Sequence, residues 1–124
     1  MNNDSDFKYE VFEEFVYFEF STEADFDGAK KEADFVKEIL LKVKKSKLIS
    51  KLNYDPLQLE LYEDYALAEY YQEIGLDQIL SKAALITKKE NMENFEFWKT
   101  VVQNRFIDVK LFDNYEQAKE WILE

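Results

Sequence analysis

The chain has 124 residues, 47% of them hydrophobic, and a formal net charge of −11. With only two glycines and one proline it is too apolar and too poor in loop-forming residues to be disordered, so we expect a single domain spanning residues 1–124. The lack of cysteine and histidine removes thiol nucleophiles, disulfides, histidine general bases and nearly all zinc chemistry. We therefore expect a protein that is not an enzyme and that holds no metal and no cofactor.

The sequence also predicts a location. Its first residues have neither the basic start nor the apolar run of a signal peptide, and no stretch approaches the ~20 apolar residues of a spanning helix. We therefore expect a soluble cytoplasmic protein. Because its acidic surface repels phosphates and anionic lipids, we expect no membrane partner and no direct nucleic-acid partner.

A β-hairpin is predicted at the start of the chain. Apolar and polar residues alternate from Phe7 to Val11, with Phe7 and Val11 on the same side as Tyr9. A second aromatic run then follows from Phe15 to Phe20. Two short runs of this kind, so close together, are typical of paired strands.

A helix is predicted next, from a capping box at Thr22–Asp25 to about Lys45. Its apolar residues recur every three or four positions, as in a helix that packs on a sheet. This stripe consists of Phe26, Ala29, Ala33, Val36, Leu40 and Val43. A coiled coil has a similar repeat, but alanine and phenylalanine in the seam favour packing on a sheet.

The middle of the chain is predicted to form a strand and a second helix. The strand covers Leu48 to Tyr54 and ends at Asp55-Pro56, because proline cannot donate to a strand ladder. The helix covers Leu57 to Ile74, with Gly75 as its C-terminal stop.

The last third is predicted to contain two strands and two helices. The continuous apolar run at 83–87 indicates a central strand covered on both faces, and hence a parallel sheet with helices above and below it. A last strand is expected over Val109–Phe112. Asn91 or Asn94 is expected to cap the first helix, and the 113–116 segment has capping-box spacing before the second. The side chains expected to be buried in these helices are Phe95, Trp98, Val102, Ala118, Trp121 and Ile122.

The predicted fold is therefore α/β. It begins with an N-terminal hairpin and continues with alternating helices and strands. The expected sheet is mixed, mostly parallel and five-stranded, with about four helices.

A tract rich in tyrosine and acids carries the main functional signal. Between Leu52 and Ser81 there is no lysine or arginine, but there are seven acids and five tyrosines. Because tyrosine offers an apolar ring with a polar tip, we interpret the helix in this tract as a face presented to a partner. The candidate partner-binding residues are Tyr62, Tyr65, Glu69, Tyr70 and Glu73. The alternative is that these rings lie along the domain edge with their hydroxyls in water.

No group of residues specifies a reaction. The only glycines, Gly28 and Gly75, do not have the spacing of a phosphate-binding loop. Asp25, Asp27 and Glu32 lack the spacing of a calcium loop and stand where a helix N-terminus favours acids.

The order of elements resembles the STAS-like superfamily, also called SpoIIAA-like after the anti-sigma-factor antagonist. Lys82-Ala-Ala-Leu-Ile-Thr87 is similar to the "K-x-A-h-h" strand of that superfamily. Val109-Lys-Leu-Phe-Asp-Asn-Tyr-Glu-Gln-Ala-Lys-Glu-Trp-Ile-Leu123 resembles its "h-x-h-F-x-x-x-x-x-A-x-x-W-L" ending. The likeness extends over nearly the whole chain and is greatest to short, uncharacterised bacterial members.

One motif of the resembled antagonists is missing. They carry a phosphorylatable serine, usually in Asp-Ser-Ser-Gly, just after the third strand. This chain has Asn53-Tyr-Asp-Pro-Leu-Gln there, with no serine or threonine between Lys51 and Gln78. It therefore lacks the phosphoacceptor serine motif.

The resemblance and the acidic tract together favour a non-enzymatic protein–protein interaction or regulatory domain. An alternative is an acidic mimic, such as an inhibitor or immunity protein, that binds a basic partner surface. A further alternative is a carrier of a small apolar ligand, because the STAS-like fold is similar to lipid-binding domains of the Sec14 type.

A basic segment next to the acidic tract leaves the oligomeric state open. Its lysines are Lys42, Lys44, Lys45, Lys47 and Lys51. They either pair with the acidic helix of a second copy, giving a homodimer, or form a separate surface of one monomer.

Overall fold

A computed structural model describes residues 2–4, 7–21, 25–53 and 59–124. The strands are β1 (Asn2–Asp4), β2 (Phe7–Val11), β3 (Val16–Phe20), β4 (Lys47–Leu52), β5 (Lys82–Ile86) and β6 (Val109–Phe112). The helices are α1 (Phe26–Val43), α2 (Leu61–Glu73), α3 (Leu76–Ile79), α4 (Met92–Gln103) and α5 (Tyr115–Leu123). A 3₁₀ turn at Lys89–Asn91 precedes α4.

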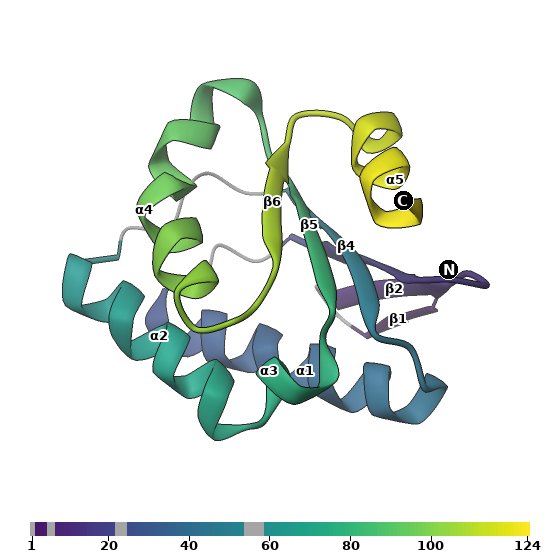
Figure 1. Cartoon of the computed structure of the whole chain (residues 1–124), viewed down its shortest axis with the longest axis horizontal. Helices are drawn as coiled ribbons and strands as arrows, with labels where there is room; N and C mark the ends of the chain where they lie inside the picture. Colours follow the sequence, from purple (N-terminus) through teal and green to yellow (C-terminus); the bar gives the residue numbers. More distant parts are fainter. Residues whose placement is uncertain (1, 5–6, 22–24, 54–58) are drawn as a thin grey trace.

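All six strands form one mixed sheet whose spatial order follows the chain, from β1 to β6 (Figure 1). The first three strands pair antiparallel, and β3 to β6 pair parallel. The α/β class and the N-terminal hairpin are thus confirmed. The structure adds one strand to the five expected, because β1 reads Asn-Asn-Asp and has no apolar alternation that could signal it.

The helices are divided unequally between the two faces of the sheet. Each parallel connection steps one strand onward in the same direction, and right-handed crossovers of this kind place α1, α2 and α4 on one face. Helix α5, which follows the last strand, packs on the other face against β4, β5 and β6 (Figure 1). The predicted cover on both faces is therefore present, with α5 alone on its side.

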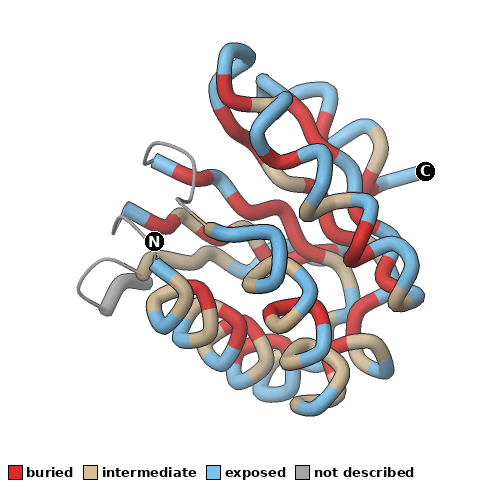
Figure 2. The backbone as a smooth tube through the Cα atoms, turned by 90° about the vertical axis from the view of Figure 1, so that its left-hand side faces the viewer, coloured by how far each residue is buried: buried red, intermediate tan, exposed pale blue. Residues whose placement is uncertain are grey.

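The sheet thus separates two cores. We call the core under α1, α2 and α4, which also includes the short α3, the three-helix layer, and the core under α5 the α5 layer. In the three-helix layer, Val16, Phe18 and Phe20 of β3 point toward α1, as the alternation of that strand requires. The buried residues of the α5 layer are Phe15, Ile49, Ala84, Ile86, Phe112, Ala118 and Ile122. Figure 2 shows the result, with long buried stretches in the central strands and exposed outer sides on the helices.

Two helices begin at a different residue from the one expected. Asp25 is itself the N-cap of α1, since its carboxylate accepts a hydrogen bond from the Gly28 backbone N–H at 2.8 Å. The predicted cap Thr22 lies outside the described residues. In α5 the cap is Asn114, one residue later than expected, because its extended backbone lets its amide oxygen accept from the Gln117 N–H at 2.9 Å.

The predicted second helix starts later than its sequence suggested. Residues 59 and 60 are not helical, and α2 begins at Leu61, where the Glu63 carboxylate accepts from the Glu60 backbone N–H at 3.0 Å. Gly75 has a φ of 82°, the left-handed conformation that favours glycine, and it ends the helix as expected. The preceding strand ends at Leu52, and Tyr54, Asp55 and Pro56 lie outside the described residues.

Among the described helices, none combines the length and the apolar character needed to cross a bilayer. The long helix α1 carries most of its apolar residues on one side, and Leu41 on the outer side is 53% exposed. Ala29, Ala33, Val36 and Leu40 of the predicted stripe are buried, and Phe26 and Val43 at its ends are half-buried. The stripe packs on the sheet, as the sequence predicted.

Candidate functional site

The outward side of α2 presents three of the five candidate residues in one stripe. Tyr62, Glu69 and Glu73 are spaced by seven and four residues, so they project from the same side of the helix. Leu67 and Ala68, on the inward side, are buried. The Tyr62 ring is 71% exposed, and both glutamates are exposed.

Tyr65 extends this face toward α4. Its ring is 50% exposed and meets the Phe97 ring edge to face, with 5.6 Å between the ring centroids. Phe97 is 37% exposed and belongs to the same surface, although the sequence did not single it out. Its position between the buried Phe95 and the half-buried Trp98 places it off the inward stripe of α4, which is the signal that could have identified it.

Tyr70 has a different role from the other candidates. Its hydroxyl donates to the Asp34 carboxylate of α1 at 2.5 Å, and the Lys30 ammonium lies 4.9 Å from its ring centroid. The hydrogen bond to Asp34 is the main reason why the Tyr70 pKa is raised. Tyr70 is therefore half-buried and joins α2 to α1, so it is a poor choice for testing a contact surface.

We define the α2 surface as Tyr62, Tyr65, Glu69 and Glu73 together with Phe97. Neither Glu69 nor Glu73 forms an ion pair with any described residue. At the first turn of the same helix, partial burial and then the neighbouring Glu63 charge raise the pKa of Asp64 to about 6. Acidic groups and exposed aromatic rings thus occupy one side of α2 without a cation from the same helix.

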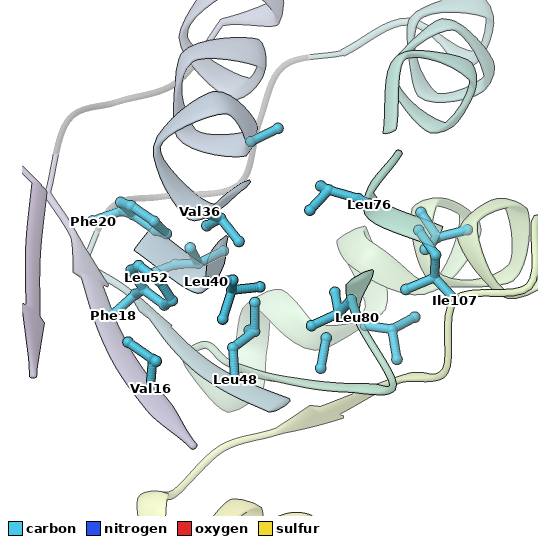
Figure 3. Packing of buried hydrophobic residues seen from close by; sticks show 14 of the residues in the cluster. Val16, Phe18, Phe20, Val36, Leu40, Leu48, Leu52, Leu76, Leu80 and Ile107 are labelled. Carbon is cyan, nitrogen blue, oxygen red and sulfur yellow. The ribbon is translucent and has the colours of Figure 1, made fainter. Parts of the chain in front are cut away.

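A second feature lies in the three-helix layer. A partly open cavity of about 110 Å³ lies between the sheet and α1, α2, α3 and α4. In Figure 3, Val36 of α1, Leu48 of β4 and Leu76 of α3 stand around this space, with Leu80 just after α3. The polar side chains among its lining are Glu32, Ser50, Tyr71 and Trp98.

Asp25 and Lys82 have structural roles. Asp25 caps α1, and no three carboxylates among the described residues gather in a way that could hold a metal ion. Lys82, at the start of β5, donates to the Trp121 carbonyl oxygen at 2.8 Å, and its ammonium lies 4.7 Å from the Trp121 ring centroid. Lys82 therefore joins the sheet to the C-terminal end of α5, where a cation is favourable.

Comparison of the chain with protein-family models, with curated proteins and with solved structures found no match. Function is therefore inferred from the residues and their geometry. The structure shows two candidate sites: the α2 surface, which the sequence predicted in part, and the cavity, whose lining residues the sequence did not identify.

Proposed function

We propose that this chain is a non-enzymatic protein-interaction or regulatory domain of the STAS-like type, that it acts in the cytoplasm, and that the α2 surface is its contact face. The observation that carries this proposal is the exposure of Tyr62 and Tyr65 beside Glu69 and Glu73, two carboxylates with no described cation partner. Large exposed rings are enriched at the centres of protein interfaces, where they become buried.

The chemistry of this surface selects a partner that carries arginine or lysine. A guanidinium group stacks on the face of a tyrosine ring and forms paired hydrogen bonds with a carboxylate. The α2 surface offers both kinds of group within about three turns of one helix. A basic, partly apolar patch on another protein would therefore complement it, and the net charge of −11 would speed the encounter.

The STAS-like assignment is supported by the arrangement of elements. A hairpin followed by alternating helices and strands, ending in a helix that bears Trp121, is the order on which the resemblance was based. The missing phosphoacceptor motif favours a domain whose binding is not switched by phosphoserine in the manner of the resembled antagonists.

The test is affinity capture of the tagged protein from extract of its native cell, followed by measurement of the captured partner's affinity. Tyr62→Ala combined with Tyr65→Ala should weaken binding at least tenfold, or by about 1.4 kcal/mol, because tyrosine is enriched among the interface residues whose truncation costs most. The matched control is Leu41→Ala, which removes a side chain that is 53% exposed on α1. Equal binding by the double variant and the control would overturn the proposed face.

A charge variant separates ionic from apolar contacts on the same surface. Glu69→Lys with Glu73→Lys should also weaken binding, whereas Glu116→Lys with Glu120→Lys, which makes the same change on α5, should not. Full binding after reversal of the α2 charges would contradict a basic partner.

The acidic alternative is a mimic that occupies the nucleic-acid site of a basic protein. The observation that favours it is the large negative charge together with aromatic rings among the acids. Its signature is competition, because duplex DNA would displace the domain from its partner and affinity would fall steeply with salt. A partner that binds DNA and this domain simultaneously would exclude mimicry and leave the interaction domain.

A second copy of the chain is the remaining candidate occupant. The lysines around Lys44 and Lys51 would have to meet the α2 surface of another molecule. Sedimentation of the purified protein at low salt measures this directly. A monomer at micromolar concentration would favour a different protein as the partner.

A further inference from the structure

We propose that the cavity in the three-helix layer is a binding site for a neutral small molecule that has a compact apolar body and one polar group. The cavity lies on the inner side of α2 and has no residue in common with the α2 surface. The proposal is therefore independent of the partner proposal, and each can fail alone.

The cavity exists because small residues line it where larger ones would fill it. Ala29 and Ala33 of α1 and Ala83 of β5 all contribute to its wall. An engineered cavity of about 150 Å³ lined by apolar side chains stays dry and takes up benzene. A space of about 110 Å³ therefore suits a single ring or a chain of about five or six carbons.

A polar group is built into the floor of the cavity. Ser50 stands on β4 between Leu48 and Leu52, on the face of the sheet that is otherwise apolar. It is only 5% exposed, so its hydroxyl lies under the helices rather than in solvent. A leucine at this position would continue the core, whereas serine places one hydrogen-bonding group against the apolar space.

A second polar group comes from α2. The Tyr71 hydroxyl accepts a hydrogen bond from Trp98 Nε1 at 3.3 Å, and both side chains line the cavity. Burial raises the pKa of Tyr71, so the phenol remains neutral. Ser50 and Tyr71 could thus orient a hydroxyl or carbonyl group of a ligand whose apolar part fills the remaining space.

The charges around the cavity select a neutral ligand. Its described lining includes the carboxylate of Glu32 but no lysine or arginine. Burial is the main reason why the pKa of Tyr71 is raised, and the nearby carboxylates of Glu32 and Asp64 raise it further. A carboxylate ligand would therefore be repelled and would lose its hydration without gaining a cation partner.

The two tryptophans make binding measurable. Trp98 lines the cavity, whereas Trp121 packs in the α5 layer on the other face of the sheet. A Trp121→Phe protein leaves Trp98 as the only tryptophan, and its fluorescence can be titrated with hexan-1-ol, benzene and hexanoate. We expect saturable changes with the alcohol and with benzene, and affinity for hexanoate at least tenfold weaker than for the alcohol. No saturable change with either neutral probe would overturn the proposal.

Further substitutions in the Trp121→Phe protein test whether the probes bind in the cavity. Ala33→Leu fills the cavity and should reduce the affinity for hexan-1-ol at least tenfold, and Ala29→Leu is a second filling variant in case the first does not fold. The matched control is Ala66→Leu, which makes the same change at a half-exposed position of α2 outside the lining. Undiminished binding by a folded filling variant would show that the probes bind elsewhere.

The polar end has its own test. Ser50→Ala should lower the affinity for hexan-1-ol several-fold and leave the affinity for benzene unchanged, because only the alcohol can form a hydrogen bond with the serine hydroxyl. Equal loss for both probes, or for neither, would overturn the assigned role of Ser50. Tyr62→Ala should not change the affinity for either probe. Failure of the cavity proposal can therefore be distinguished from failure of the partner proposal.

Discussion

The two faces of the sheet are packed in different ways. In the α5 layer a single helix of nine residues covers β4, β5 and β6, and Ile49, Ala118 and Ile122 there are completely buried. The three-helix layer holds a larger core but contains a partly open cavity of about 110 Å³. The comparison teaches that the same sheet supports one layer whose side chains interlock closely and another that has room for a ligand.

The close packing of the α5 layer is reinforced by polar contacts. Lys82 joins β5 to the last turn of α5, both by its hydrogen bond and by its position over the Trp121 ring. The Tyr115 ring at the start of the helix meets the Tyr17 ring of β3 edge to face, with 5.6 Å between the centroids. Both ends of α5 are therefore fixed to the sheet.

The largest expected loss of stability comes from truncating a buried side chain in the α5 layer. Ile122→Ala should lower the free energy of unfolding by about 3–4 kcal/mol, because a fully buried side chain is lost from a site that cannot collapse. Urea unfolding followed by circular dichroism measures the change. Leu123→Ala, at a neighbouring side chain that is 42% exposed, is the control and should cost less than about 1 kcal/mol. Similar losses for the two variants would mean that α5 is not closely packed.

The same substitution should have opposite effects in the two layers. Ala118→Leu adds three heavy atoms to a completely buried position and should destabilise the protein by about 1–3 kcal/mol. Ala33→Leu enters the cavity and should stabilise by about 1 kcal/mol. Thermal unfolding of both proteins gives the comparison, and a large loss from Ala33→Leu would show that the cavity cannot accept this side chain.

The smallest expected change in stability comes from removing the Asp64 carboxylate, on the three-helix side of the sheet. The Asp64 pKa is about 6 in the folded protein against its usual 3.8, so the folded state binds more protons between these values and loses stability as pH rises through that window. Asp64→Asn should therefore raise stability at pH 8 and have no effect near pH 3.5, below both values.

Solvent exposure of Asp64 limits the size of that gain to on the order of 1 kcal/mol or less. Urea titrations at the two pH values measure it. Glu69→Gln, which removes a charge from an exposed position of the same helix, is the control. A gain of equal size for Asp64→Asn at both pH values would show that its burial is not the cause.

Much of the fold was predictable because it depends on local periodicity. The alternation in Phe7–Val11, the three-to-four spacing in α1 and the continuous apolar run of β5 each reflect a face that must be buried. The caps of α1 and α5 were displaced by three residues and by one residue, because adjacent acids and amides could cap equally well, whereas Asn91 is the N-cap of α4 as expected. Strand β1 could not be predicted from three polar residues.

The site was predictable only in part. The composition of the tract showed that some tyrosines would be exposed, and Tyr62 and Tyr65 are. It did not show that Tyr70 binds Asp34, nor that Phe97 lies beside Tyr65, since both contacts join helices distant in sequence. The cavity depends on how far α1 and α4 stand from the sheet around alanine side chains, which no single segment specifies.

The sequential strand order also bears on how the protein is made. Every strand after β1 pairs with the strand that precedes it in the chain, so its neighbour has always been synthesised earlier. None of the described strands must wait for a later segment to be inserted between it and an earlier one, and each parallel pairing closes a loop that contains one or two helices. The sheet can therefore grow strand by strand from the hairpin during translation, and the α5 layer forms after the helix that follows β6 has been synthesised.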